Sequence, residues 1–306
     1  MKSKASPSTT FLLPAMLSAA LLGACVPAQR PDAPMSTGMA ATDGARQWRD
    51  DVALLAVADG NAGRRSALQQ RLETMGLHVR SMPFESRNLS GVNLLADVGG
   101  PADAPLLLIG AHYDKVNVGR GATDNASGTA TVLALGERFL RAPLRNHRVA
   151  LAFWDLEERG LVGSAAYIAN GGAKPALYVN FDVFAWGDTL WMMSPEADAP
   201  LVAASRAAAS ARGIAFTAGE QYPPTDHRAF LKAGWPAVSY SLVGSDEIPL
   251  ILEEFAGRKP AKTPKVMEVI HHAADTMDHV DAQAAARGVD ALEAGLRAWD
   301  AAAAAP

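Results

Sequence analysis

Acidic residues and histidines that could do chemistry recur in this 306-residue chain at the ends of apolar segments. They are His112, Asp114, Asp124, Glu157, Glu158, Asp182 and His271. Neutral imidazoles and carboxylates are the ligands that zinc-like ions prefer in proteins. Five such ligands, one of them a bridging carboxylate, could hold two ions about 3.5–4 Å apart, and a water between those ions would have its pKa lowered to about 7. The residue types therefore point to a two-metal hydrolytic site.

Hydrophobic patterning indicates which elements position these residues. Continuous apolar runs are expected for strands buried on both faces, and alternating runs for exposed strand pairs. The predicted strands are 78–84, 92–98, 105–110, 149–155, 176–184, 189–193 and 237–242, and the predicted helices lie within 48–76 and over 126–140, 160–169, 201–212 and 282–303. Their alternation after residue 105 predicts a three-layer α/β/α sandwich with a mixed, largely parallel central sheet.

The candidate ligands stand where loops begin. In open α/β sheets, ligands bind beyond the carboxyl ends of the strands. His112 and Asp114 follow the strand at 105–110, and Glu157 and Glu158 follow the strand at 149–155. Asp182 lies near the end of the next strand, and His271 follows the strand-like run 266–270. We expect these side chains to meet at one edge of the sheet.

The N-terminal segment has the composition of a targeting sequence. Lys2 and Lys4 precede an apolar run over residues 11–24 that is too short to span a bilayer. The run ends at Cys25, the single cysteine of the chain. This segment resembles a bacterial lipoprotein signal, which implies cleavage before Cys25 and acylation of its thiol. The alternative is an ordinary secretory signal with a chance cysteine.

The rest of the chain is predicted to contain one folded domain. We expect a signal peptide over 1–24, a flexible tether rich in proline, alanine and serine over 25–45, and a single domain over 46–303. The domain has no cysteine, so disulfides cannot contribute to its stability. The formal net charge is -4, and residues 1–24 carry two lysines and no acidic residue. An acidic chain argues against nucleic acid as a partner, because phosphate binding needs basic patches.

Six ordered motifs resemble those of the co-catalytic zinc exopeptidases of peptidase family M28, the relatives of aminopeptidase Y and of bacterial leucyl aminopeptidase. The motifs are GAHYDKV, TDNASGTA, WDLEERGLVGS, NFDV, TDHRAFLKAGWPAV and HHAADT. The resemblance covers about residues 90–295. It implies a zinc-exopeptidase fold, two Zn²⁺ per chain, with Co²⁺ or Mn²⁺ as alternatives, and peptide substrates.

The same resemblance assigns roles to the candidate residues. It implies that His112 and Asp182 ligate one zinc, that Glu158 and His271 ligate the other, and that Asp124 bridges the two. The register selects His271 rather than His272 as the last ligand. Two catalytic roles are also implied: Glu157 is the general base, and Asp114 orients the imidazole of His112.

Further residues are expected to contact the substrate. His227, in a motif similar to the Asp-His pair of the family, is a candidate for the substrate pocket and not for metal binding, while Asp226 is expected to cap the helix 227–233. Some relatives carry a tyrosine beside the last metal histidine to stabilise the oxyanion, whereas this chain has Ile270 there. Tyr222 and Tyr240 are the candidates for that role. His78, His147 and His279 are expected on the surface, and Phe184, Trp186, Trp191 and Met193 in the core, with an apolar substrate pocket as the alternative.

The expected activity is hydrolysis of N-terminal residues from peptides by a lipid-anchored enzyme of the bacterial cell envelope. The membrane contact would be the lipid on Cys25, and Val26 after it favours the outer membrane facing the periplasm. A glutaminyl-peptide cyclotransferase, which has this fold and a single zinc, is the alternative. Only four residues separate Glu158 from Gly163, which favours the peptidase. A binding lipoprotein without catalysis is a third hypothesis, and the complete ligand set argues against it.

Overall fold

The computed structural model describes residues 37–86 and 88–303. These described residues form one compact unit. The expected signal peptide and Cys25 lie outside the described residues. The helix α1 (Thr37–Ala56) begins earlier than expected, so residues 37–45 of the expected tether are helical. No helix within the described ranges has the length and apolar character needed to cross a membrane.

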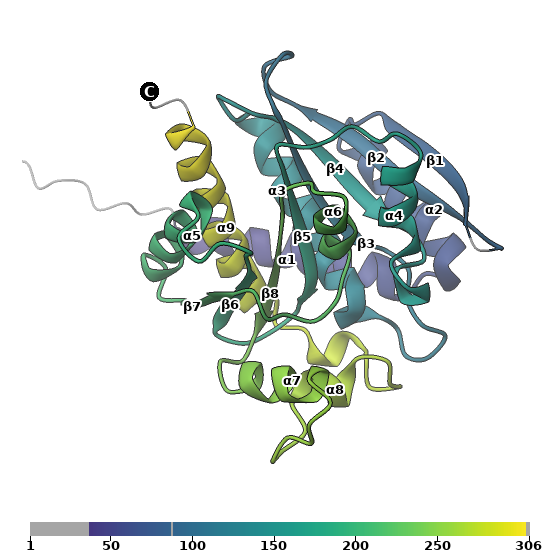
Figure 1. Ribbon diagram of the computed structural model, residues 1–306, viewed down its shortest axis with the longest axis vertical. Helices are drawn as coiled ribbons and strands as arrows, with labels where there is room; N and C mark the ends of the chain where they lie inside the picture. Colours follow the sequence, from purple (N-terminus) through teal and green to yellow (C-terminus); the bar gives the residue numbers. More distant parts are fainter. Residues whose placement is uncertain (1–36, 87, 304–306) are drawn as a thin grey trace, which may run out of the picture. The chain divides into compact units, whose positions relative to one another are not determined.

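One mixed sheet runs through the described unit in the strand order β1-β2-β4-β3-β5-β8-β6-β7 (Figure 1). The strand β3 is parallel to β4 and β5, and β5 is parallel to β8, whereas β1, β2 and β4 pair in antiparallel fashion. The strand β6 is parallel to β7 and antiparallel to β8. The bounds are β1 Val79–Ser86, β2 Leu89–Gly99, β3 Leu106–His112, β4 Arg148–Trp154, β5 Leu177–Phe184, β6 Thr189–Met193, β7 Ala215–Gly219 and β8 Ala237–Val243.

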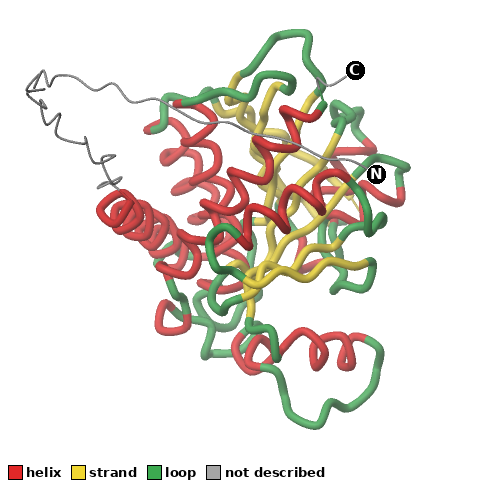
Figure 2. The backbone as a smooth tube through the Cα atoms, turned by 90° about the vertical axis from the view of Figure 1, so that its left-hand side faces the viewer, coloured by secondary structure: helices red, strands yellow, loops and turns green. Residues whose placement is uncertain are grey.

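Helices cover both faces of this sheet, which confirms the predicted three-layer sandwich (Figures 1 and 2). The helices α4 (Val162–Ala169) and α6 (His227–Lys232) contact one face. The other face packs against α1, α2 (Gly60–Thr74), α3 (Ser127–Arg141), α5 (Pro200–Ser210) and α9 (Ala282–Ala302). The central strand β3 is buried along its whole length: Leu107 and Ile109 face the larger cluster, and Leu106 and Leu108 face the smaller one.

A helical segment at one end of the sheet was not predicted. The helices α7 (Glu247–Phe255) and α8 (Lys265–Val269) lie together there in both ribbon views (Figures 1 and 2). The prediction of a strand at 266–270 is therefore wrong. A short apolar run of β-branched residues such as Val266 and Val269 has no periodicity that separates a strand from a helix. The short strand β7 was also missed, and the turn between β1 and β2 is shorter than expected.

The expectation that His147 lies on the surface is wrong as well. Its side chain is buried, and its ring stacks on Trp299 with centroids 4.3 Å apart. Its Nδ1 lies 2.8 Å from Asp300 Oδ1. Asp300 also accepts from the backbone N–H groups of Arg145 and Asn146. These contacts join the loop before β4 to the C-terminal helix α9, far from the candidate ligands.

Candidate metal centre

Three neighbouring parallel strands bring the first candidate ligands together. His112 is the last residue of β3, which lies between β4 and β5. Glu157 and Glu158 occupy the 3₁₀ turn that follows β4. Asp182 lies in β5 where its pairing with β8 shifts register. Because the carboxyl ends of parallel strands meet at one edge of a sheet, these side chains converge there, as predicted.

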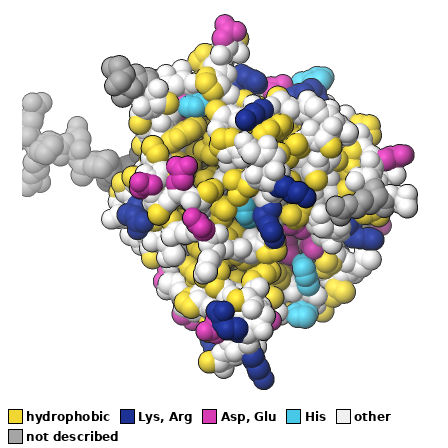
Figure 3. Space-filling model, viewed as in Figure 1, with side chains coloured by type: hydrophobic (Ala, Val, Ile, Leu, Met, Phe, Trp, Pro, Cys, Tyr) yellow, Lys and Arg dark blue, Asp and Glu magenta, His cyan; other side chains and the backbone are white. Residues whose placement is uncertain are grey.

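Asp124 lies at the centre of two sets of ligands. His112 Nε2 lies 3.3 Å from Asp124 Oδ1 and 3.6 Å from Asp182 Oδ1. On the other side, His271 Nε2 lies 3.0 Å from Asp124 Oδ2 and 3.0 Å from Glu158 Oε2. Each oxygen of Asp124 therefore faces a different histidine. Acidic and histidine side chains adjoin on the face drawn in Figure 3.

The donor atoms of this cluster fit a metal ion. The ligand atoms of His112, Asp124 and Glu158 lie within 4.8 Å of one another, as do those of His112, Glu157 and Asp182. Within the described part of the chain, His112 Nε2, Glu158 Oε1 and Asp182 Oδ1 are buried and have no hydrogen-bond partner. Buried polar atoms normally find partners, so orphaned atoms within these two overlapping donor groups indicate a place for cations. Imidazole nitrogens and carboxylate oxygens are suitable ligands for zinc.

Asp114 connects the ring of His112 to the turn that carries Glu157 and Glu158. Its Oδ1 lies 3.3 Å from His112 Nδ1 and accepts from the backbone N–H of Glu157 at 3.0 Å. Its Oδ2 accepts from the backbone N–H of Glu158 at 3.2 Å. The turn itself begins at Leu156, whose φ of 59° places it in the left-handed region. Asp114 therefore fixes the ring of His112 and the two glutamates at once, as a positioning residue.

The carboxylates of the site set the charge of the two histidines. Burial lowers the pKa of His112, but the surrounding carboxylates, Glu157 first, outweigh burial and raise it well above its ordinary value. Hydrogen bonds to Asp124 and Glu158 raise the pKa of His271 to about 10. Burial opposes ionisation of Asp124, yet both histidines together lower the pKa of its carboxyl. The carboxylates of the cluster therefore favour positive charge among them, which a bound cation would also supply.

Glu157 differs from its neighbours in this cluster. Burial raises the pKa of its carboxyl well above the ordinary value, with the neighbouring acids adding to the effect. The structure gives its side chain no hydrogen bond to a described residue, and it lines the cavity beside the ligands. A carboxylate with a raised pKa and free access to the cavity has the properties of a general base near neutral pH.

Asp275 and Arg64 support the site, and sequence reasoning did not single them out. Asp275 accepts from the backbone N–H groups of Thr123 and Asp124. Arg64, on α2, is fully buried and donates to the backbone carbonyl of Leu55 in α1 and to those of the loop residues Tyr113, Asp114, Arg120 and Gly121. Their partners are backbone atoms, which no motif reveals. Asp275 at least belongs to the HHAADT motif.

A cavity of about 260 Å³ adjoins the ligands. Apart from the site residues its walls are mainly apolar, and they come from β6, β8, α7 and α8: Trp191, Val243, Ile251, Phe255, Val266, Met267 and Ile270. Trp191, expected in the core, is buried and also lines this cavity. The unpredicted segment from α7 to His271 therefore supplies both a candidate ligand, His271, and most of an apolar wall.

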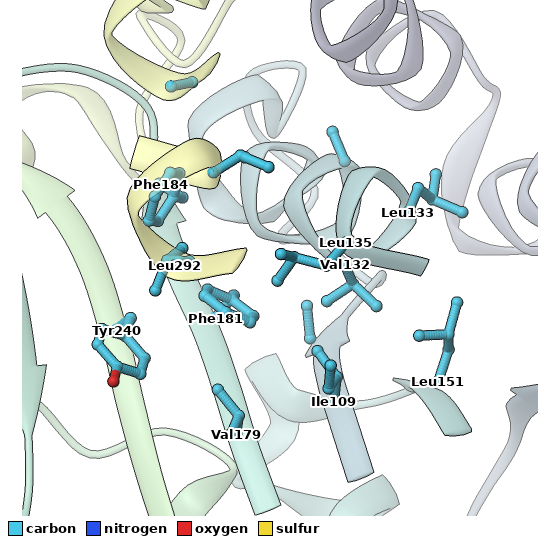
Figure 4. Packing of buried hydrophobic residues seen from close by; sticks show 14 of the residues in the cluster. Ile109, Val132, Leu133, Leu135, Leu151, Val179, Phe181, Phe184, Tyr240 and Leu292 are labelled. Carbon is cyan, nitrogen blue, oxygen red and sulfur yellow. The ribbon is translucent and has the colours of Figure 1, made fainter. Parts of the chain in front are cut away.

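Of the residues predicted to contact substrate, two lie at or near the cavity and one lies in the core. Tyr222 lines the cavity, and its hydroxyl bonds to Ser241. His227 is buried beside Tyr222. Tyr240, in contrast, is a core residue, and the prediction that it contacts substrate is wrong (Figure 4). Its hydroxyl lies 2.8 Å from Ser205 Oγ. Alternate residues of a strand point to opposite faces, so Ser241 and Val243 reach the cavity and Tyr240 cannot.

Asp226 stands at the N-cap position of α6, as predicted, but its side chain makes no capping hydrogen bond. Its carboxylate is fully buried, and within the described residues neither oxygen has a hydrogen-bond partner. Burial raises the pKa of this carboxyl to about 7. Asp226 is therefore not an ordinary helix cap.

The fold, the ordered ligands and a family model together define the class of this protein. The model described as "Peptidase family M28" matches residues 93–294. The chain belongs to peptidase family M28. Among curated relatives, it is 34% identical over 134 residues to leupeptin-inactivating enzyme 1 of Streptomyces exfoliatus, which covers 41% of this chain and 31% of that protein. It is also 34% identical over 116 residues to "Probable lipoprotein aminopeptidase LpqL" of Mycobacterium tuberculosis, which covers 37% of this chain and 22% of that protein. The matches thus span less than a third of either relative.

Solved structures share the fold. An aminopeptidase from an Aneurinibacillus strain superposes with a TM-score of 0.65 at 14% identity, covering 82% of this chain and 93% of that one. A glutaminyl cyclase from Porphyromonas gingivalis superposes with a TM-score of 0.64 at 18% identity, covering 85% of this chain and 98% of that one. The likeness shows a common fold, and both activities predicted from the sequence occur on it.

Proposed function

We propose that this protein is a zinc-dependent aminopeptidase that holds two metal ions and removes N-terminal residues from peptides. The observation that carries the proposal is the position of Asp124, whose two oxygens face His112 and His271 separately. A bridging carboxylate between two complete ligand sets suits a two-metal hydrolase. The printed name of one curated relative, a probable lipoprotein aminopeptidase, supports the same activity.

In this proposal each residue has a distinct task. His112 and Asp182 would hold one ion, Glu158 and His271 would hold the other, and Asp124 would contribute to both. Two such ions would polarise the scissile carbonyl and lower the pKa of the attacking water. Glu157 accepts the proton of that water and returns it to the leaving amine nitrogen. The carboxylates of Glu158 and Asp182 attract the free α-amino group of the substrate.

Tyr222 is the proposed oxyanion donor. Its ring lines the cavity together with Glu157 and Asp182. Burial raises the pKa of its phenol, so the hydroxyl keeps its proton and can donate a hydrogen bond. The apolar cavity beyond it would hold the side chain of the N-terminal residue.

A glutaminyl-peptide cyclotransferase remains the second candidate, because a cyclase shares the fold over most of both chains. A single-zinc enzyme needs only one of the two ligand sets. Here both sets are complete and share Asp124, which favours the peptidase.

The location of the enzyme is a separate proposal. We propose that Cys25 is acylated and anchors the enzyme to the bacterial cell envelope, in the outer membrane facing the periplasm. The sequence pattern before Cys25 supports this, as does the word "lipoprotein" in the name of one relative. Cys25→Ser should release the protein from membrane fractions and abolish labelling with a fatty-acid analogue. Membrane retention of that variant would contradict the proposal.

Metal content and substrate choice test the main proposal together. We expect two zinc ions per chain and release of aniline from aminoacyl anilides that stops when a chelator is added. The matched assay offers a peptide with N-terminal glutamine and follows loss of ammonia. One zinc per chain, no anilide cleavage and cyclisation of glutamine would identify a cyclase instead.

A further inference from the structure

A second cavity of about 710 Å³ lies next to the metal centre. It is bounded by the loop after the two glutamates, by the end of β6 and by α6, with Gly160, Leu161, Met193 and Tyr222 among its lining residues. Tyr222 lines both this cavity and the smaller one at the ligands. The two cavities are therefore neighbours that share one tyrosine.

Residues of the strand β6 line both cavities and set the distance between the two. Trp191 lines the cavity at the ligands, and Met193, two residues later on the same face of the strand, lines the second cavity. Residues two apart on a strand are separated by about 7 Å, which is also the length of about two residues of extended peptide. A substrate whose scissile bond lies at the metal centre could thus place its next one or two residues in the second cavity.

A buried histidine with a free nitrogen lines this second cavity. His227 is only 2% exposed, and within the described residues its Nδ1 has no hydrogen-bond partner. Its ring meets that of Tyr222 edge-on, with centroids 5.8 Å apart. Burial and the nearby Arg228 lower the pKa of His227 to about 4, so its imidazole is neutral and can donate from one nitrogen and accept at the other.

Two basic residues complete the wall. Arg228 and Lys232 lie four residues apart on α6, hence on one face of the helix, and both are exposed. Among the described residues neither forms an ion pair within 4.0 Å, and Glu220 is the acidic residue that lines the same cavity. Lys and Arg side chains also adjoin the acidic and histidine cluster in Figure 3. The site thus has a strongly acidic end at the ligands and a basic end at α6.

We propose that the second cavity binds the carboxyl-terminal part of dipeptide and tripeptide substrates, with His227 bonded to the peptide backbone and Arg228 and Lys232 paired with the terminal carboxylate. The inference rests on the proposed function, since it places a peptide across the metal centre. A short peptide has a positive amine and a negative carboxylate at opposite ends, which matches the two ends of the site. A free terminal carboxylate is then a determinant of substrate choice.

The test compares a leucine tripeptide with a free carboxylate and the same tripeptide as its C-terminal amide, using zinc-loaded protein. We expect kcat/KM to be about tenfold higher for the free acid at low salt and the preference to shrink as salt screens the exposed cations. Arg228→Gln combined with Lys232→Gln should bring the ratio of the two substrates close to one. His227→Phe, which keeps a ring against Tyr222, should raise KM for both tripeptides more than for a leucyl anilide.

Arg49→Gln combined with Lys174→Gln removes the same charge from exposed positions outside the cavity and should leave the ratio unchanged. The anilide has no residue beyond the scissile bond, so its cleavage reports on the proposed function alone. Cleavage of the anilide with equal rates for acid and amide, or a preference that survives the Arg228 and Lys232 changes, would overturn the inference and leave the peptidase standing. No cleavage of any of the three substrates would refute the proposed function and the inference with it.

Discussion

Asp275 holds the backbone of Asp124, although 151 positions separate the two residues. Its Oδ1 accepts from the N–H of Thr123 at 2.6 Å and its Oδ2 from the N–H of Asp124 at 3.1 Å. The carboxylate of Asp275 thus holds the backbone that carries Asp124, the proposed bridging ligand. Since such outer partners usually contribute tenfold to a hundredfold to metal affinity, Asp275→Ala should weaken zinc binding by about that factor. Zinc titration against a chelator would measure it.

The matched control for that change is Asp278→Ala, an exposed acid three residues later in the same segment. Asp275→Asn keeps one acceptor oxygen and should fall between Asp275→Ala and the unaltered protein. Equal zinc affinity in Asp275→Ala and Asp278→Ala would show that Asp275 does not position the bridge.

The adjacent glutamates should separate catalysis from metal binding. Glu157→Gln removes the proposed base but no ligand, so kcat should fall by about 10²–10⁴-fold while zinc content is retained. Glu158→Gln removes a ligand and should lower zinc content as well. Steady-state kinetics and metal analysis on both variants would decide. Full activity in Glu157→Gln would disprove its assignment as the base.

The two adjacent histidines offer a similarly matched pair. His271 Nε2 lies 3.0 Å from Asp124 and from Glu158, whereas His272 is exposed and, among the described residues, its side chain forms no ion pair with a candidate ligand. We expect His271→Ala to lose one of two zinc ions and most activity, and His272→Ala to keep both. The reverse result would shift the ligand by one residue.

Arg64 links α2 to the loops that carry the site. Five hydrogen bonds join its guanidinium to backbone carbonyls, and one of these carbonyls belongs to Gly121, whose φ of 57° lies in the left-handed region. Arg64→Ala would leave those buried acceptors unpaired, so it should reduce the free energy of unfolding by on the order of 3–5 kcal/mol.

Urea unfolding of the metal-free protein would measure this loss, and the adjacent, half-buried Arg65 provides the control as Arg65→Ala. Arg64→Lys restores the charge but not the fork of donors. If lysine rescues stability completely, charge rather than backbone bonding is what Arg64 contributes.

From the buried carboxyl of Asp226 we predict that the folding stability of the protein depends on pH. Burial raises the pKa of its carboxyl from 3.8 to about 7, so the folded state binds the proton more tightly than the unfolded state does. The resulting stability is complete below about pH 4 and is lost as pH rises through about 7, a change of roughly 4 kcal/mol at most. Asp226→Asn cannot ionise and should be more stable than the unaltered protein at pH 8 but not at pH 4. Thermal melts in chelator at several pH values would show this, and parallel curves for the two proteins would contradict it.

Much of the candidate site could be predicted because its residues lie at a recognisable place, the carboxyl ends of buried strands. His112, Glu157 and Asp182 stand at or near the carboxyl ends of buried strands, and apolar runs reveal those strands directly. The sheet order and layers then bring the residues together. The family model supports the motifs but does not itself test the role of each residue.

The residues that the sequence analysis misplaced or missed share one cause: their positions depend on contacts with residues far away in the sequence. His147 is buried only because Trp299 and Asp300 return to it from α9. Tyr240 and Ser241 are adjacent, and a one-residue difference in strand phase sends one into the core and the other to the cavity. Arg64 bonds to carbonyls, whose positions depend on the complete fold. The local sequence around these residues therefore does not predict their partners.

The segment from α7 to His271 combines two tasks, which limits how this protein can diverge. Glu247 at its start is buried and bonds to Trp186 Nε1 at 2.8 Å and to the N–H of Val266 at 2.8 Å, which joins α7 to α8. The same segment ends in the proposed metal ligand His271 and carries Ile251, Phe255 and Met267 on the cavity wall. A substitution that reshapes this wall to admit a new side chain also moves the anchor of His271. If His271 binds metal as proposed, selection for altered specificity in this protein would therefore also act on metal retention.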